Sequence, residues 1–351
     1  MADLWGHLQE YYSVHGSDAV YVANVFYKTT TVIKHLGGSD NGIPSCTLSR
    51  TNAEIFLRDA LLRYQLKVEI WAQSSAAGKG AATSSWTMKC SASPGNLQAM
   101  EDILFASSEA PEMSIIMAVS VRVRGGEKSL GIAFLDASQR EIGVCEFVDN
   151  DAYSILESLL IQLSVKECLI KGTVETKDHE LLQIRTLLQR CNVVVTDTKP
   201  SMFSTSDLEQ DLNRLLGGEN SVATRAEFEL KEGMASTAAL IEYLSLLSDE
   251  GNFGNYTLFQ YRLSQFMKLD AAAVAALNLA PSSNDAIFMH TKPTGYNKTM
   301  SLQGLLDRCK TAQGSRLLGQ WLKQPLLDIA EIRERQDMVQ VFFDDMGLRE
   351  S

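Results

Sequence analysis

Two aspartates at the ends of predicted strands are the candidate metal ligands of a possible nuclease. Asp136 ends the second of three consecutive strand-like runs, and Asp197 ends a later one. A two-metal nuclease needs several carboxylates that converge on its ions. The centre of the first run reads Met117-Ala118-Val119-Ser120-Val121 and supplies no carboxylate. A nuclease therefore stays an alternative for which the sequence offers no complete metal site.

A second motif, Gly78-Lys79-Gly80, suggests a loop that could hold phosphate. A phosphate-binding loop has an earlier glycine, spaced by four residues from Gly-Lys, and a Ser or Thr after the lysine. Here Gln73 or Ser74 occupies the upstream place, Gly80 follows the lysine, and no segment fits G-x-x-x-x-G-K-[ST]. We therefore expect no ATPase activity, no catalytic residue and no cofactor in this chain.

The thiols and imidazoles are scattered. The six cysteines stand singly, none forms C-x-x-C, and the five histidines lie far apart in the sequence. Reduced thiols, some of them buried in apolar strands, are the expectation, so we predict a cytosolic or nuclear protein without a metal site. No apolar run reaches transmembrane length, and the first ten residues lack a basic-then-apolar signal pattern, so no membrane contact is expected.

The net charge of -11 is unevenly distributed. Residues 106–262 hold 14 basic and 24 acidic side chains, whereas residues 1–105 hold 8 and 9, and residues 263–351 hold 10 and 10. A surface that binds the phosphates of DNA needs a local basic excess. Any nucleic-acid contact is therefore expected from the first or the last third.

The pattern predicts an α/β and α+β multidomain protein, with domains at 1–106, 107–262 and 263–351. The middle domain shows three strand-like runs at 115–124, 130–136 and 141–147, followed by alternating helices and strands, beginning with a helix capped by Asn150. Three antiparallel strands followed by this alternation form the RNase H-like order. The first domain is a small mixed α/β unit, with a helix capped by Asn52 and strands at 68–71 and 86–90.

The last third reads as the start of an all-α domain. Thr311 is expected to cap a helix that ends before Pro325, and Asp328 with Glu331 forms a capping box for the next helix. The first of these helices is expected to turn Leu317, Leu318, Trp321 and Leu322 inward, and the second to bury Ile329, Ile332, Val339 and Phe342.

The wording of this region is specific. The string SLQGLLDRCKTAQGSRLL-x-x-WLKQPL within Ser301–Asp345 closely resembles the start of the lever domain of the MutS family of mismatch-repair proteins. The RNase H-like middle domain resembles that family's non-catalytic connector, notably at Asp211-Leu212-Asn213-Arg214. The first domain resembles its mismatch-binding domain. The resemblance thus spans nearly the whole chain, from about Tyr11 onward.

Within the first domain, Glu10-Tyr11-Tyr12-Ser13 occupies the place where mispair-reading members carry Asp-Phe-Tyr-Glu. In those members the phenylalanine stacks at the mispair and the glutamate bonds to the displaced base. Tyr11 could still stack, since an aromatic wedge can replace lost base stacking, but Ser13 lacks a carboxylate. The wording instead resembles the common eukaryotic subunit, whose partner reads the mispair. An alternative is that Tyr11 and Tyr12 end a strand and pack on the core.

The resemblance implies a role in mismatch repair for a non-reading subunit of a nuclear heterodimer. Its expected partners are duplex DNA with mismatches or small loops, a second MutS homologue (homologue 6 or 3) and MutL-type proteins. ATP and magnesium belong to full-length members, whose clamp and ATPase this chain does not resemble. Tyr11, Tyr12, Ser13, Lys28 and Arg50 are the candidate DNA contacts. A protein-binding scaffold without DNA contact remains a further alternative.

One departure concerns the first ten residues, MADLWGHLQE, which do not resemble the segment that precedes the motif in the family. We therefore expect the small sheet to lack a strand and to leave an edge open. A second expectation concerns the lever, which we expect to be incomplete. An exposed apolar patch around Trp321, Leu322, Val339 and Phe342 should result.

Overall fold

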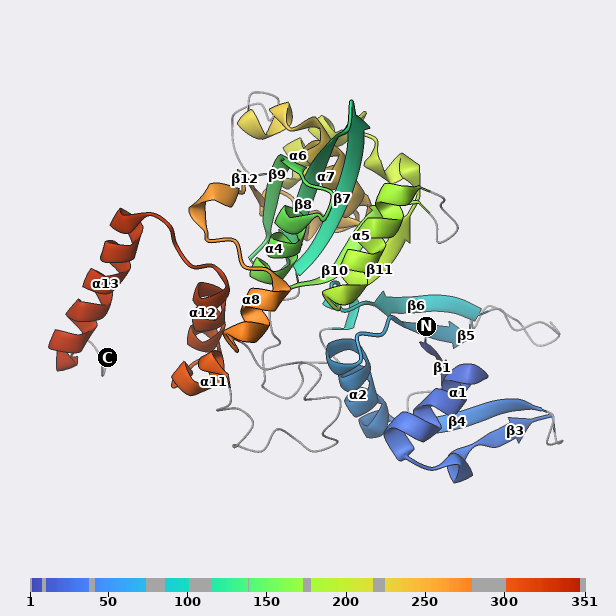
Figure 1. The fold of residues 1–351 in the computed structure, drawn as a ribbon. Coiled ribbons are helices and arrows are strands. Elements are labelled where there is room, and N and C mark those ends of the chain that lie inside the picture. The colour runs from blue at the N-terminus through green and yellow to red at the C-terminus, as the bar shows by residue number, and fades with distance from the viewer. Residues whose placement is uncertain are drawn as a thin grey trace. The chain divides into compact units, whose positions relative to one another are not determined.

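The computed structural model describes residues 2–7, 11–37, 42–73, 86–100, 115–137, 139–172, 178–216, 225–279 and 301–347. The chain forms two compact units, Met1–Ser114 and Ile115–Ser351. Figure 1 shows the elements of both units in chain order. Each unit has its own sheet and its own core, and each is described by itself.

The first unit is built on a six-stranded sheet. From edge to edge its strands are β3 (Lys34–Leu36), β4 (Ile43–Ser49), β2 (Tyr11–His15), β1 (Ala2–His7), β5 (Val68–Gln73) and β6 (Trp86–Ala92). β1 runs antiparallel to β2 and parallel to β5, and Leu4 pairs with both Val14 and Ile70. The expectation that this sheet lacks a strand is therefore wrong: residues 2–7 supply one in its interior.

One face of this sheet is covered by helices. α1 (Ser17–Val22) continues as a wider helical turn over Ala23–Tyr27, and α2 (Arg50–Arg58) continues in the same way over Asp59–Arg63. Apolar residues of these helices and of β2, β4 and β5 form one core, which includes Val14, Leu48, Phe56, Leu57, Leu61 and Ile70.

Ser49, not Asn52, caps α2. The Ser49 hydroxyl accepts a hydrogen bond from the backbone nitrogen of Asn52, so the helix begins three residues earlier than predicted. A short hydroxyl side chain immediately before the first helical residue satisfies a backbone N–H that would otherwise lack an acceptor. Both residues are good capping types, and here the end of β4 fixes the helix start at the first of them.

The second unit also contains a six-stranded sheet. Its strands, from edge to edge, are β11 (Val194–Thr198), β10 (Val165–Lys171), β7 (Ile115–Arg124), β8 (Glu127–Asp136), β9 (Glu141–Asp149) and β12 (Thr257–Gln260). β7, β8 and β9 are antiparallel to one another, and β10 is parallel to β7 and to β11. The predicted RNase H-like strand order is thus observed, with β12 added parallel to β9.

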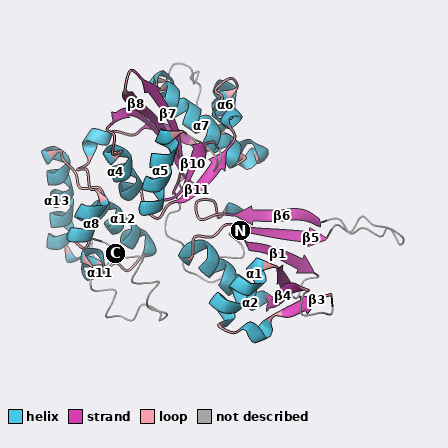
Figure 2. Ribbon diagram, turned by 45° about the vertical axis from the view of Figure 1, so that its right-hand side comes forward, coloured by secondary structure: helices cyan, strands magenta, loops and turns pink. Residues whose placement is uncertain are grey.

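Helices cover both faces of this second sheet. In the two views, α4 (Ser154–Gln162) and α5 (His179–Arg190) lie on one side of it, and α6 (Leu208–Leu215) and α7 (Lys231–Tyr243) on the other (Figures 1 and 2). The core on the α7 side includes Ile116, Ala118, Leu169, Leu212 and Leu240. A sheet buried on both faces explains why its strands read as continuous apolar runs.

The start of α4 differs from the prediction that Asn150 caps it. The helix begins at Ser154, and the Asp149 carboxylate accepts hydrogen bonds from the backbone nitrogens of Ile155 and Leu156 at 3.1 and 2.9 Å. Asn150 Oδ1 accepts from the nitrogens of Ala152 and Ser154, so it orders the turn that leads into the helix. The carboxylate at the end of β9 therefore satisfies the first turn.

The helical part, residues 263–347, contains α8 (Ala271–Ala276), α11 (Leu302–Leu306), α12 (Ala312–Lys323) and α13 (Ile329–Asp344). Thr311 and Asp328 cap the last two helices as predicted, accepting from the nitrogens of Gly314 and Ala330. The Glu331 carboxylate, predicted to complete a capping box with Asp328, accepts hydrogen bonds from the side-chain amide of Gln265. Seven short helical turns complete the helices that the structure describes, at Thr30–Val32, Gln98–Met100, Pro200–Phe203, Ala226–Glu229, Leu246–Ser248, Glu250–Asn252 and Leu263–Gln265.

The burial predicted for α13 is wrong. Ile329, Val339 and Phe342 are 65%, 59% and 47% exposed, because an apolar period identifies a face but not what covers it. On α12, Leu317 is exposed as well. The expected apolar patch is therefore present at Val339 and Phe342, whereas Trp321 is partly covered by Arg335, whose guanidinium carbon lies 4.4 Å from the ring centroid.

Candidate nucleic-acid interface

The three candidate residues on β2 alternate between the two faces of the first sheet. Val14 lies in the core beneath the helices, and Tyr12 packs against the same core. Since neighbouring residues on a strand point to opposite faces, Tyr11 and Ser13 belong to the other face. Tyr11 is 48% exposed there. Core packing thus accounts for Tyr12, and Tyr11 offers an accessible aromatic ring.

Ser13 is not accessible in the same way. It is 9% exposed, and its Oγ lies 3.0 Å from Nε2 of His15, the next residue on the same face. Burial lowers the pKa of the His15 imidazole from its ordinary value, which favours the neutral ring. The Ser13 hydroxyl therefore has a neighbour on its own strand and a side chain too short to reach outward.

Arg50 lies near Tyr11 through the pairing of β2 with β4. Tyr11 is the register partner of Ser49, and Arg50 follows Ser49 as the first residue of α2. Arg50 Nε is 3.2 Å from Glu54 Oε1, but its side chain is 73% exposed, so the ion pair contributes little to stability and leaves the guanidinium accessible. An exposed ring, a cation and a helix N-terminus therefore occur at one end of the β2–β4 pair. Helix N-termini favour anions such as phosphate.

Lys28 comes from a different element. It ends the helical turn after α1 in the left-handed conformation, with φ 54°, and its side chain is exposed. The preceding Tyr27 donates its hydroxyl proton to the carbonyl of Thr47, the register partner of Ser13. Lys28 is thus tied to the same strands through Tyr27, from the face that the helices cover.

The contacts of two further residues in this region were not predicted from the sequence. Ser49 positions Arg50 by capping α2, and His15 holds the Ser13 hydroxyl. The signal for Ser49 was available, since a serine directly before a helical period is a capping residue. The His15 contact could be inferred only once residues 11–15 were known to be a strand, because side chains two apart then share a face.

The aspartates of the nuclease alternative do not converge. Asp136 ends β8 and Asp197 lies on β11, and β7 and β10 stand between those strands. Three strand spacings alone separate them by about 14 Å across the sheet, which is already too far for a shared metal ion. Asp197 is also ion-paired with Arg185. Over the described residues, no group of three or more His, Cys, Asp and Glu side chains could hold a metal.

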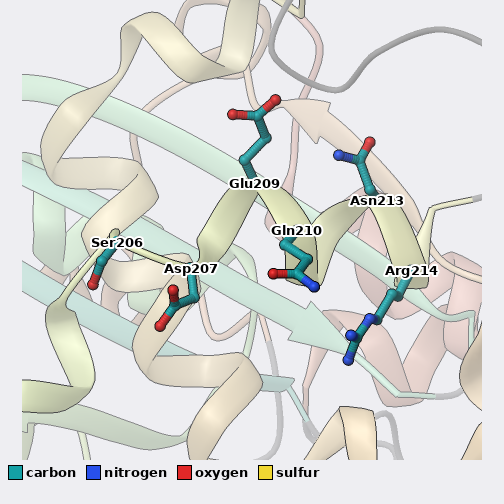
Figure 3. A pocket seen from close by; sticks show the side chains of 6 residues that line it. All are labelled: Ser206, Asp207, Glu209, Gln210, Asn213 and Arg214. Atoms are coloured by element: carbon teal, nitrogen blue, oxygen red, sulfur yellow. The ribbon is translucent and has the colours of Figure 1, made fainter.

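A depression of about 450 Å³ lies on the outer side of α6. It is lined by Ser206, Asp207, Glu209, Gln210, Asn213 and Arg214. Figure 3 shows Glu209 and Asn213 on one side of the helix, and Asp207, Gln210 and Arg214 on the other. Two carboxylates and a single guanidinium do not attract a phosphate backbone, which agrees with the acidic balance of the middle third.

Comparison with known proteins covers both units. Residues 5–101 match MutS domain I, residues 114–257 match MutS domain II, and residues 272–351 match MutS domain III. The DNA mismatch repair protein msh-2 of Neurospora crassa is 46% identical over 347 residues, which is 97% of this chain and 35% of that protein. MSH2 of Zea mays is 36% identical over 344 residues, 97% of this chain and 34% of that protein.

A further relative and a solved structure were also compared. MSH2 of Saccharomyces cerevisiae is 36% identical over 358 residues, covering 97% of this chain and 36% of that protein. The chain thus spans about a third of the length of these relatives. A solved structure, the fowlpox virus Holliday junction resolvase, covers 37% of this chain at 12% identity with a TM-score of 0.27, too low to support an argument. In the described part of the chain no helix is long and apolar enough to span a membrane. Three consecutive domain matches and these relatives together show that the chain belongs to the MutS family of DNA mismatch repair proteins.

Proposed function

We propose that this chain acts in DNA mismatch repair as the first three domains of a MutS-type subunit that binds mismatched duplex DNA without reading the mispair. The 46% identity to the msh-2 protein over nearly the whole chain supports the subunit type. The observation that carries the non-reading role is the burial of Ser13, whose hydroxyl lies against His15. Because it is buried against His15, the Ser13 hydroxyl is not accessible to a displaced base.

The proposed DNA contact is made by the exposed end of the β2–β4 pair. Tyr11 offers a ring for stacking, and Arg50 at the start of α2 offers a charge and backbone donors for phosphate. Lys28 is an exposed cation at the end of the neighbouring helical turn. Tyr12 and Ser13 act indirectly in this proposal, by holding the strand. Binding by so few charges is weak and sensitive to salt.

The proposed partners follow from the family. A second MutS homologue, homologue 6 or 3, would supply the mispair-reading domain, and MutL-type proteins would act downstream in the nucleus. ATP and magnesium belong to the whole family protein. We propose that this chain alone is not an enzyme, because its sequence contains no G-x-x-x-x-G-K-[ST] loop. ATP hydrolysis by the pure chain above background would contradict that.

Gel-shift titration with a homoduplex and a G·T duplex tests the proposal. Similar, weak, salt-sensitive shifts of both duplexes are expected. Arg50→Ala should reduce the slope of the logarithm of the binding constant against the logarithm of the salt concentration by about 1. Lys89→Ala is the matched control, because it removes one exposed cation from β6 at the edge of the same sheet. A clear preference for G·T would contradict the non-reading role. No shift of either duplex, with retained binding of a second MutS homologue, would favour the scaffold alternative.

A further inference from the structure

The corner between α4 and β10 is the place where the helical part is attached to the sheet part, residues 115–262. Gln162 is the last residue of α4, Ser164 takes the left-handed conformation with φ 53°, and β10 begins at Val165. Both α8 and α12 pack on α4. The two views agree on this arrangement, with α8 and α12 beside α4 (Figures 1 and 2).

The corner meets the helical part through directed hydrogen bonds. Gln162 is 5% exposed, and its side-chain amide donates to the carbonyl of Met267 at 2.8 Å. Its own backbone carbonyl accepts from the side-chain amide of Gln324, itself 6% exposed, at 3.3 Å. Lys323 Nζ donates to Ser164 Oγ at 2.7 Å. A buried amide that loses its partner is costly, so these bonds fix one geometry.

The segments that receive these bonds are joined to each other. Met267 donates its backbone N–H to the carbonyl of Pro325 at 2.8 Å, and Leu327 donates to the carbonyl of Gln265 at 3.2 Å. Residues 265–267 and 325–327 therefore form a short antiparallel clip. The 162–164 corner bonds to Met267 in one arm of the clip and to residues 323–324 at the start of the other.

Within residues 301–347 apolar burial contributes little to this attachment, whereas Leu269 and Leu279, in residues 263–279, are 6% and 7% exposed. Among the described residues of 301–347 whose side chains are also described, the buried ones are Ser301, Gly319 and Gln324, and none has a large apolar side chain. An apolar contact tolerates sliding, whereas paired amides specify distance and direction. The polar corner thus adds a fixed distance and direction to the packing of the helical part.

We propose that Gln162 is a positioning residue: it fixes the helical part on the sheet part through a polar joint that can be released while both parts stay folded. The joint consists of Gln162 and Ser164 on one side and of Met267, Lys323 and Gln324 on the other. This assignment is independent of DNA binding, since the proposed DNA contacts lie in the first unit.

Hydrogen exchange with mass spectrometry tests the joint in the full chain. Gln162→Glu keeps the size of the side chain but replaces the donor to the Met267 carbonyl by a carboxylate oxygen. We expect exchange at least about tenfold faster in peptides over 265–267 and 324–327, because the clip then opens locally. Peptides of β7, β8 and α7 should stay within about twofold of the unchanged chain.

Gln189→Glu is the matched control, because it makes the same substitution at an exposed glutamine near the end of α5 and should leave every peptide unchanged. Lys323→Met tests the joint from the other side without touching the sheet core, and it should also loosen the clip. Unchanged exchange at the clip in both Gln162→Glu and Lys323→Met would overturn the proposal. Equal loss of protection in β7 and β8 would overturn it too, since Gln162 would then be an ordinary core residue.

Discussion

Gly131 on β8 and Glu232 on α7 meet backbone against backbone. A β-carbon on Gly131 would lie 2.0 Å from the carbonyl carbon of Glu232 and 2.3 Å from the nitrogen of Gly233. Ser236, one turn further along α7, donates its hydroxyl proton to the Gly131 carbonyl at 2.7 Å, and this bond also holds α7 against β8. A methyl group at position 131 must displace the whole helix.

Gly131→Ala is therefore expected to destabilise the second unit by about 3 kcal/mol, at the upper end of overpacking costs. Urea unfolding followed by circular dichroism measures this. Gly319→Ala is the control: its β-carbon would meet the flexible end of Gln303, and alanine favours the interior of α12. An equal loss of stability in the two variants would contradict the close approach of α7 to β8.

Ser13→Glu should not create mispair reading. The position is buried on the sheet face, so the new carboxylate would be desolvated and would cost about 3 kcal/mol rather than reach a base. Thermal unfolding and gel shifts with G·T and homoduplex DNA measure both effects. Ser13→Ala, which removes only the contact with His15, provides the comparison. A gain of G·T preference in Ser13→Glu would show that the site opens on binding.

The neighbours Tyr11 and Tyr12 should separate binding from stability. Tyr11→Ala is expected to weaken DNA binding and to change the unfolding free energy by less than about 0.5 kcal/mol, because the ring is exposed. Tyr12→Ala should instead cost about 2 kcal/mol, because its ring packs on the core. Parallel titrations of both variants with DNA and with urea decide this. The reverse assignment of effects would contradict the described faces of β2.

Glu180 should make the second unit sensitive to acid. Hydrogen bonds from Lys128 and Tyr153 lower the pKa of the Glu180 carboxyl, with Lys128 the larger cause. A lowered pKa in the folded state means that the carboxylate stabilises the fold above the ordinary pKa of about 4.3. This stabilisation is lost as the pH falls through the lower folded value.

Glu180→Gln should therefore flatten the decline in stability below about pH 5. Urea midpoints measured from pH 7 down to pH 3 test this, with Glu127→Gln as the exposed control on β8. Hydrogen bonds to Glu180, the larger cause, and to Asp151 raise the pKa of the Lys128 ammonium, so its contribution is present below its ordinary pKa and is lost at alkaline pH. If stability falls below about pH 5 as steeply in Glu180→Gln as in the unchanged chain, Glu180 does not cause that decline.

The middle sheet was predictable because its signals are local. The β7 and β8 runs, joined by Gly125-Gly126, are long and apolar, and both glycines adopt positive φ as the turn requires. The capping hydroxyl of Thr311 was equally local. In such places residue type and spacing determine the element without reference to distant parts of the chain.

The features that escaped prediction depend on partners far away in sequence. Residues 2–7 contain Gly6 and no β-branched side chain, and they become a strand because β2 and β5 both pair with them. The exposure of Phe342 likewise depends on what packs against α13, and the spacing of apolar residues along α13 does not predict that. In the candidate interface, only the register of β2 against β4 placed Arg50 beside Tyr11.

Because β1 lies in the interior of the first sheet, it alone connects β3, β4 and β2 on one side with β5 and β6 on the other. Without residues 2–7, β3, β4 and β2 would form one ribbon, β5 and β6 another, and each would carry a bare hydrogen-bonding edge. A synthetic peptide of residues 1–10 added to a chain that lacks them should then restore the sheet in trans. The rest of the first domain thus provides the binding site for residues 2–7.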